Sequence, residues 1–198
     1  MKCGNIAAFL DRDGVITELE NYNEGNKVKF ILEKKDVKLI SGSVEAIKLL
    51  NKNKIKTIIT SNQPAIARGL ITEEKMKLIE NYLRDLLKKE KAIINASYFC
   101  PHHPTKGINK YGIECDCRKP KPGLILKAAR EHNIDLKKSY IIGDRISDIK
   151  AGNLAGCKTI GVETGYSCND GFNDATPDFK VKNIYEAAKL IISEAKRI

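Results

Sequence analysis

Short apolar runs alternate along the chain with longer segments whose apolar residues recur at helical spacing. The runs are mostly rich in β-branched residues and stop at polar or glycine-containing segments. They predict buried strands over residues 6–10, 55–60, 96–99, 139–142 and 159–163. The amphipathic segments predict helices over residues 43–52, 72–91, 122–132, 147–155 and 184–197. Because strands and helices alternate, we expect an α/β fold, a three-layer Rossmann-like domain with a mostly parallel sheet.

The connecting segments carry start and stop signals that agree with this division. Thr72 is a suitable cap for the second helix, and Pro122 suits the first position of the third. Pro64 interrupts regular secondary structure soon after the second strand. Neither residues 14–60 nor residues 62–117 offer enough chain for a separate domain, so we expect no large cap over the sheet.

Length and composition are typical of one soluble domain. The chain has 198 residues, of which 42% are hydrophobic and 30% charged, and we expect residues 1–198 to form a single domain. No apolar run is long enough to cross a bilayer, and the stretch 6–10 is too short for a secretory signal. We therefore expect a cytoplasmic protein, monomeric and without a membrane partner.

The charge balance indicates an anionic partner without identifying it. Lys and Arg number 35 against 25 Asp and Glu, which gives a formal net charge of +10. Nucleic acid, an anionic surface or a phosphorylated substrate would each suit that charge. However, most of the basic residues are lysines, aromatic residues make up only 6%, and Trp is absent, so bases would have few side chains on which to stack. We expect a small phosphorylated metabolite and no nucleic acid partner.

Cysteine and histidine residues gather in one short segment. Cys100, His102, Cys115 and Cys117 form two pairs joined by a loop, which is how short segments build tetrahedral zinc sites. Four protein ligands leave no open position for water, so a zinc ion in this loop, residues 100–117, would be structural. The alternatives are ordinary thiols or a redox pair of Cys115 and Cys117; without a secretory signal, disulfides are disfavoured.

Acidic and hydroxyl side chains follow three of the predicted strands. Asp11 and Asp13 come after the first strand, Ser61 after the second, and Asp144 after the strand 139–142, with Asp148 one helical turn later. Ligands of open α/β sheets bind at the carboxyl ends of the strands. Carboxylates brought together there would repel one another unless a cation such as Mg²⁺ lay between them.

The order of these motifs resembles that of the haloacid-dehalogenase-type phosphatases. The match rests on residues 11–16 (DRDGVI), 61–63 (SNQ), 100–104 (CPHHP), 117–120 (CRKP) and 143–144 (GD). Within the family, these motifs are similar to those of the zinc-containing subgroup that acts on heptose 1,7-bisphosphate or histidinol phosphate. The resemblance covers residues 6 to about 181.

The resemblance implies a role for each matched residue. Asp11 would be the nucleophile that forms an aspartyl-phosphate, and Asp13 the general acid and base. Mg²⁺ would be held by Asp11, Asp144 and the backbone carbonyl of Asp13, while Ser61 and Lys119 would bind phosphate oxygens. Further substrate contacts are implied for Arg12, Asn62, Gln63, Arg68, Arg118 and Arg145.

The length of the zinc loop favours one substrate within the subgroup. Twelve residues separate His102 from Cys115, which resembles the phosphatases that hydrolyse the 7-phosphate of heptose 1,7-bisphosphate more than the histidinol-phosphatases. Asn21-Tyr22-Asn23 and Pro64-Ala65 depart from the family pattern on loops that would contact the sugar. A nucleic-acid 3′-phosphatase and a non-enzymatic phospho-receiver remain as alternatives. A receiver, however, would carry its acceptor Asp on a middle strand and would not need a Cys/His loop.

Overall fold

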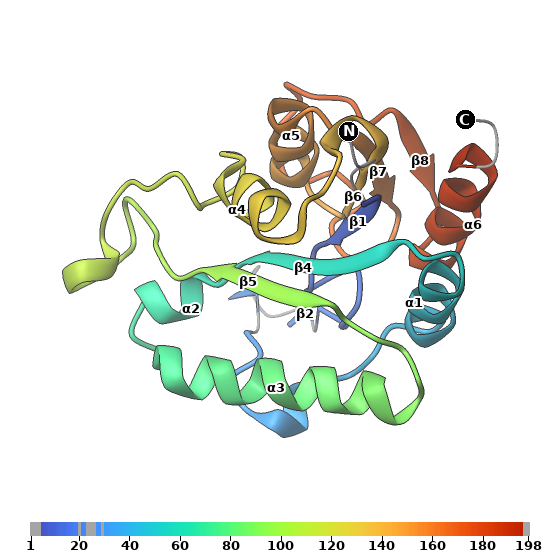
Figure 1. Ribbon diagram of the computed structural model, residues 1–198. Helices are drawn as coiled ribbons and strands as arrows, with labels where there is room; N and C mark the ends of the chain where they lie inside the picture. The colour runs from blue at the N-terminus through green and yellow to red at the C-terminus, as the bar shows by residue number, and fades with distance from the viewer. Residues whose placement is uncertain (1–4, 20, 23–26, 29, 196–198) are drawn as a thin grey trace.

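A six-stranded, all-parallel sheet forms the centre of the molecule (Figure 1). The computed structural model of the chain describes residues 5–19, 21–22, 27–28 and 30–195. Within them the strands run in the order β5-β4-β1-β6-β7-β8. Their bounds are β1 Ala7–Leu10, β4 Lys56–Asn62, β5 Ala96–Cys100, β6 Tyr140–Gly143, β7 Lys158–Val162 and β8 Phe179–Val181. The expected mostly parallel sheet is confirmed.

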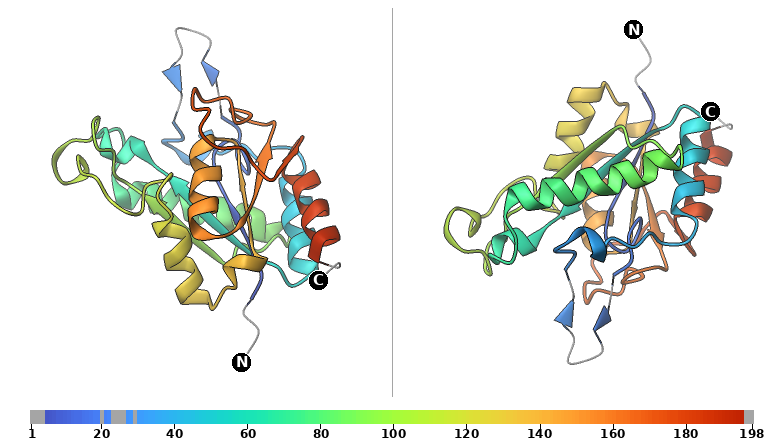
Figure 2. Two further views of the ribbon diagram at one scale, coloured as in Figure 1. Left: turned by 90° about the horizontal axis from the view of Figure 1, so that it is seen from above. Right: turned by 90° about the horizontal axis from the view of Figure 1, so that it is seen from below.

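Helices cover both faces of this sheet, which confirms the three-layer α/β prediction (Figure 2). The helices are α1 Ser43–Lys52, α3 Glu73–Lys89, α4 Gly123–His132, α5 Ile146–Ala155 and α6 Ile184–Ala195. Ala8 and Leu10 of β1 pack with α1, α3 and α6, whereas Ala7 and Phe9 pack with α4 and α5. Successive strand residues point to opposite faces, so the apolar run of β1 is buried on both sides.

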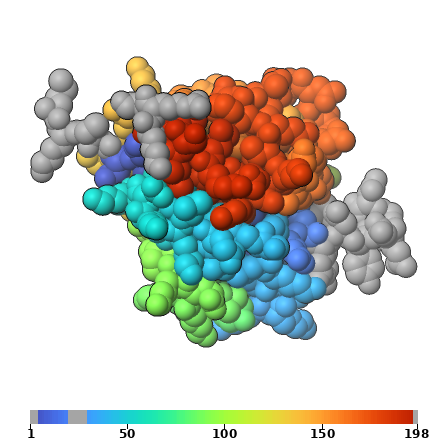
Figure 3. Space-filling model, turned by 90° about the vertical axis from the view of Figure 1, so that its right-hand side faces the viewer, coloured from blue at the N-terminus to red at the C-terminus, as the bar shows by residue number. Residues whose placement is uncertain are grey.

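The side of the molecule away from the zinc loop is closed by two helices. There α6 packs against α1 (Figure 3), and Ile184, Ala188 and Ile191 join Ala46 and Ile47 in one apolar cluster. Among the described helices, none is both long enough and apolar enough to pass through a lipid bilayer.

The short elements are where sequence and structure differ. Helix α2 (Pro64–Ala67), strand β8 and the hairpin of β2 (Asn21–Tyr22) with β3 (Lys27–Val28) were not predicted. The 3₁₀ turns η1 Lys34–Asp36, η2 Asn109–Tyr111 and η3 Leu136–Lys138 were not predicted either. The long helix ends two residues earlier than expected, at Lys89, and the predicted end of the last helix at Arg197 lies outside the described residues.

The strand register brings the expected site residues together. Leu10, the last residue of β1, lies opposite Ile59 of β4 and Ile142 of β6. The carboxyl ends of these three central strands therefore lie at the same edge of the sheet, with β4 extending three residues further, to Asn62. The zinc loop joins them after β5, since Asn62 pairs with Cys100.

Candidate active site

Three buried carboxylates meet at the carboxyl edge of the sheet. Asp11 follows β1, Asp144 follows β6, and Asp148 lies in the first turn of α5. One ligand oxygen from each lies within 4.8 Å of the others. All three side chains are buried, and Oδ1 of Asp144 has no hydrogen-bond partner. A buried, unpaired carboxylate oxygen facing two more carboxylates fits a site for a hard dication such as Mg²⁺.

Lys119 supplies the positive charge at this centre. Its Nζ lies 3.0 Å from Asp11 Oδ1, 2.5 Å from Asp148 Oδ1 and 2.7 Å from the carbonyl oxygen of Thr60. Burial disfavours the ammonium, but the two carboxylates outweigh that cost and raise the pKa of Lys119 above its ordinary value. Lys119 is therefore a cation at neutral pH, held between two acids.

The same crowding disfavours the charged form of two of the carboxylates. Burial raises the pKa of Asp11 from 3.8 to about 6, against the attraction of Lys119 and with repulsion from Asp148 and Asp13 adding to the rise. Burial, followed by repulsion from Asp11 and Asp148, raises the pKa of Asp144 well above its ordinary range. A bound cation would relieve both effects, which also supports the fit of a metal to this site.

Asp13 is held by four hydrogen-bond donors. Its Oδ1 accepts from Arg12 Nε at 2.8 Å and Thr17 Oγ1 at 2.9 Å, and its Oδ2 accepts from Arg12 Nη2 at 2.9 Å and Gln63 Nε2 at 3.0 Å. Burial works against the charge, but Arg12 and these hydrogen bonds prevail and lower the pKa of Asp13 below 3.8. In this arrangement Asp13 is an ionised carboxylate.

Two residues expected to contact substrate are placed differently. Arg12 is 1% exposed, and its guanidinium donates to Asp13, Gln63 and Glu80 rather than into the cavity. Gln63 borders the cavity, but its amide nitrogen is engaged by Asp13 and Ser61 and its amide oxygen by Arg12. The family resemblance had implied a substrate contact for Arg12. Its pairing with Glu80, a distant residue on α3, could not be predicted from the sequence.

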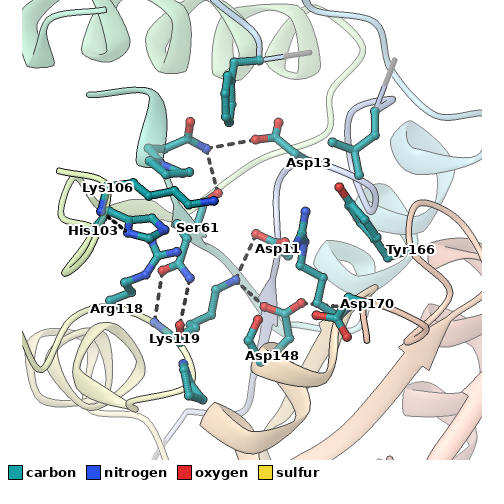
Figure 4. Close-up of a pocket in the computed structure, with 18 of the residues that line it drawn as sticks. Asp11, Asp13, Ser61, His103, Lys106, Arg118, Lys119, Asp148, Tyr166 and Asp170 are labelled. Carbon is teal, nitrogen blue, oxygen red and sulfur yellow. Dashed lines mark hydrogen bonds and ion pairs between the residues drawn. The ribbon is translucent and has the colours of Figure 1, made fainter. Parts of the chain in front are cut away.

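A cavity of about 810 Å³ opens over the carboxylates (Figure 4). In it, His103, Lys106 and Arg118 lie on one side, and Tyr166 and Asp170 on the other. Most of the other predicted site residues also line the cavity. They are Asp11, Asp13, Ser61, Asn62, Gln63, Arg68, Lys119 and Arg145. Sequence reasoning missed His103, Lys106, Tyr166 and Asp170, because only the loop conformations bring them to the cavity.

Arginines mark both ends of this cavity. Arg118 Nη1 donates to the carbonyl oxygen of His102 at 3.0 Å, and Arg68 lies over the ring of Phe30, 5.1 Å from its centroid. On the far side, the Arg145 guanidinium lies 3.7 Å from the centroid of the Tyr166 ring. These contacts hold the three guanidinium groups in place, and their residues line the cavity, so they add positive charge to its walls.

The four predicted zinc ligands lie together at the base of the zinc loop. Cys100 Sγ is 3.5 Å from Cys115 Sγ and 3.7 Å from His102 Nδ1, and Cys117 Sγ is 3.3 Å from Cys115 Sγ and 3.5 Å from His102 Nδ1. One atom from each of the four residues lies within 4.8 Å of the rest. Three thiols and one imidazole at these separations fit a tetrahedral zinc ion.

The fold and this edge of carboxylates and lysine define a class of hydrolase, and comparison with known proteins agrees. The HAD-hydrolase-like family model matches residues 116–187. The D-glycero-beta-D-manno-heptose-1,7-bisphosphate 7-phosphatase of Photorhabdus laumondii is 37% identical over 171 residues, which cover 85% of this chain and 86% of that protein. The D-glycero-alpha-D-manno-heptose-1,7-bisphosphate 7-phosphatase of the same organism is 34% identical over 185 residues, 93% and 95% of the two chains.

A solved structure shows the same architecture. The D,D-heptose 1,7-bisphosphate phosphatase of B. bronchiseptica, crystallised with magnesium and phosphate, superposes with a TM-score of 0.79 at 26% identity. It covers 96% of this chain, and this chain covers 99% of it. The present protein is therefore a HAD-like phosphoric monoester hydrolase. Within that class, it belongs to the family of the D-glycero-D-manno-heptose-1,7-bisphosphate 7-phosphatases.

Proposed function

We propose that the enzyme hydrolyses the 7-phosphate of D-glycero-D-manno-heptose 1,7-bisphosphate, with Mg²⁺, through a phosphorylated Asp11. The observation that carries the proposal is a single cavity whose base and rim carry different charged groups. A carboxylate and lysine centre lies at its base, and arginines lie at its rim. Such a cavity suits a substrate with two phosphates, one to be cleaved and one to be held. Relatives named for either anomer match this chain, so the anomer preference is left to measurement.

Asp11 is prepared for attack by its two hydrogen bonds. Its Oδ1 accepts from the backbone nitrogen of Arg12 at 2.8 Å and contacts Lys119 Nζ at 3.0 Å. Both contacts fall on Oδ1, so Oδ2 is the oxygen that attacks phosphorus. The bond between phosphorus and the C7 oxygen of the sugar breaks, and an acyl phosphate of Asp11 (an aspartyl-phosphate) forms.

Asp13 would handle the protons of both steps. It gives a proton to the departing sugar oxygen, and it takes a proton from the water that hydrolyses the aspartyl-phosphate. Its lowered pKa suits the second step, in which it acts as a base. A phosphate dianion beside Asp13 raises the pKa of that carboxyl, which is how the first step can begin with a protonated acid.

Mg²⁺ would be held by Asp11, Asp144 and the backbone carbonyl of Asp13. When bound, it neutralises charge on the phosphate oxygens as the phosphoryl group is transferred. Asp148 has another task in this proposal, because its Oδ1 is taken by Lys119 and its Oδ2 accepts from the backbone nitrogen of Arg145. It holds the lysine that, with Ser61, contacts the transferring phosphate.

The distal phosphate would bind at the basic rim. Arg118 and Arg68 are aided there by His103 and Lys106 of the zinc loop. Burial, and then the neighbouring cations, lower the pKa of His103. Arg145 approaches from the opposite side. A structural zinc ion on Cys100, His102, Cys115 and Cys117 would fix the loop that presents these groups, without taking part in the chemistry.

Steady-state phosphate release tests the proposal. The purified enzyme with Mg²⁺ should prefer either anomer of heptose 1,7-bisphosphate over histidinol phosphate and over a 3′-phosphorylated oligonucleotide, by kcat/KM. Asp11→Asn should release no phosphate, which distinguishes an enzyme with this nucleophile from contaminating activity. A preference for histidinol phosphate would contradict the substrate assignment while leaving the chemistry in place.

A further inference from the structure

The Ser61 hydroxyl is joined to a chain of buried polar groups that runs away from the cavity. Gln63 Nε2 donates to Ser61 Oγ at 2.9 Å and to Asp13 Oδ2 at 3.0 Å. Gln63 Oε1 accepts from Arg12 Nη2 at 3.0 Å. Ser61 and Gln63 are both 2% exposed, so these bonds form out of contact with bulk water. The amide therefore touches an acid, a hydroxyl and a guanidinium at once.

The neighbours of Gln63 allow its amide one orientation. The Arg12 guanidinium can only donate hydrogen bonds, so the group facing it must be the amide oxygen. Asp13 Oδ2 also accepts from Arg12 Nη2 at 2.9 Å, so it faces Gln63 as an acceptor, and the group opposite it must be the NH₂. The reversed orientation would place oxygen against carboxylate and NH₂ against guanidinium. The orientation of the amide thus follows from chemistry and not only from the atom positions.

This orientation decides the direction of the Ser61 hydroxyl. The NH₂ of Gln63 has no lone pair to accept with, so Ser61 Oγ is the acceptor in their hydrogen bond. The hydrogen of the hydroxyl is thereby free to be donated in another direction. The Ser61 side chain lines the cavity beside Asp11, and that is where a phosphate oxygen would lie. An undirected hydroxyl would spend part of its time donating elsewhere.

Glu80 holds the far end of the chain. The buried Arg12 guanidinium donates to Glu80 Oε2 at 3.3 Å, and Glu80 Oε1 accepts from Ser97 Oγ at 2.5 Å. Glu80 itself is 6% exposed on α3, with Ser97 on β5. The carboxylate balances the charge of Arg12, which otherwise would be shared between Asp13 and the amide alone.

We propose that Gln63, oriented by Arg12 and Glu80, is a positioning residue that directs the Ser61 hydroxyl hydrogen toward the transferring phosphate. The proposal rests on the proposed function, since it needs a phosphate beside Ser61. A directed donor requires no reorientation as charge grows on the phosphate oxygens, so it favours the transition state more than the bound substrate. Loss of Gln63 should therefore lower kcat more than it raises KM.

A double-mutant cycle in kcat/KM tests the proposal with heptose 1,7-bisphosphate as substrate. Ser61→Ala should cost about 10²-fold, as is typical for one preorganised donor, and Gln63→Met should cost about 10-fold. If Gln63 acts through Ser61, the double variant should be only slightly worse than Ser61→Ala alone. Any loss that remains in the Ser61→Ala background measures the contact of Gln63 with Asp13.

Asn51→Leu is a matched control. Asn51 Nδ2 donates to the Thr57 hydroxyl at 3.3 Å, so this is also an amide bonded to a hydroxyl. Thr57 lies on β4, the strand that carries Ser61, but near its other end. Its loss should lower the thermal stability without changing kcat, alone or with Ser61→Ala. Gln63→Leu provides a second variant if Gln63→Met does not fold. It also removes the donor from which Ser61 accepts, without placing a second carboxylate against Asp13, so its loss of kcat/KM should match that of Gln63→Met and should likewise shrink in the Ser61→Ala background.

The possible outcomes separate the inference from the function beneath it. Equal factors for Gln63→Met in the two backgrounds, or an unchanged kcat, would overturn the role of Gln63. Absence of heptose bisphosphate turnover in the unaltered enzyme, or full activity of Ser61→Ala, would instead contradict the proposed function and the inference with it. A Gln63 penalty that largely disappears in the Ser61→Ala background supports both.

Discussion

Gly14 lies directly against the carboxylate of Asp144. A Cβ at this glycine would overlap the Oδ2 and Cγ atoms of Asp144, and the backbone of Gly14 has a φ of +92°. Gly165, with a φ of +61°, approaches the same carboxylate from another loop. Two glycines thus leave room for a single acid, and Asp144 Oδ2 accepts from the backbone nitrogen of Tyr166 at 2.8 Å. Backbone atoms of Gly14, Gly165 and Tyr166 thus help to fix the position of this carboxylate.

Replacement of Gly14 should therefore act on the metal site. In Gly14→Ala the new methyl group would displace Asp144, and we expect the Mg²⁺ concentration needed for half-maximal activity to rise by about 10–100-fold. The matched control is Gly156→Ala, whose backbone has a φ of +81° but no atom within 4 Å of a Cβ. Both variants should lose about 1–2 kcal/mol of unfolding free energy from the positive φ. An equal Mg²⁺ requirement in the two variants would show that Gly14 does not support the metal site.

Crowding of the acids should make the metal-free protein less stable as pH rises. The pKa of Asp11 is raised from 3.8 to about 6, so the unfolded chain releases this proton before the folded protein does. The free energy of unfolding should then fall between about pH 4 and pH 6 and level off above that, and Asp144 acts in the same direction.

Urea unfolding at a series of pH values in the presence of a chelator measures this slope. Asp11→Asn is the control, since it removes the titrating group and should flatten the curve. Added Mg²⁺ should stabilise the protein more at pH 7 than at pH 5, because the cation competes with protons for the same oxygens. A free energy of unfolding that rises through this range in the metal-free protein would contradict the assigned direction.

Zinc removal should weaken substrate binding more than it affects the chemistry. We expect Cys115→Ser to lose the zinc ion and to raise KM by about 10–100-fold, because Arg118 follows directly on the zinc loop. Zinc content by elemental analysis and the separate values of kcat and KM provide the measurement. Cys157→Ala, at a buried thiol outside the cluster, should retain the zinc. Full activity of a zinc-free Cys115→Ser protein would show that the ion is dispensable.

Arg118 should matter only for substrates with a second phosphate. Loss of one charged hydrogen bond is worth about 1.5–3 kcal/mol, so Arg118→Met should raise KM for heptose 1,7-bisphosphate by about 10–100-fold. Hydrolysis of p-nitrophenyl phosphate, which has no distal phosphate, should change little. Arg84→Met removes another arginine that donates to a backbone carbonyl, that of Ile94, and should affect neither substrate. An equal loss on both substrates would place Arg118 at the cleaved phosphate instead.

The sequence was informative where periodicity and strand ends decide the structure. Alternating elements predicted the parallel sheet, and acids directly after strands predicted that Asp11 and Asp144 would meet, because carboxyl ends of parallel strands share one edge. Asp148 was noted one helical turn after Asp144, but its bond to Lys119 depends on how a loop 29 residues away in sequence is folded.

The remaining differences have particular physical causes. Helix α2 has four residues, too few to show a period, and its first residue, Pro64, was interpreted only as a break although proline also begins helices. Strand β8 has three residues with a partly exposed pattern. The partners of Arg12 come from α3 and the segment after β4, so its burial follows from packing between distant segments.

Asn62 holds Lys119 much as a neighbouring strand would. Its Oδ1 accepts from the backbone nitrogen of Lys119, and its Nδ2 donates to the carbonyl oxygen of the same residue, both at 3.0 Å. The lysine is thus in register with the end of β4, whatever the chain does between Cys100 and Cys117. Insertions or deletions there could reshape substrate recognition over evolutionary time while the phosphate-cleaving centre stays in place.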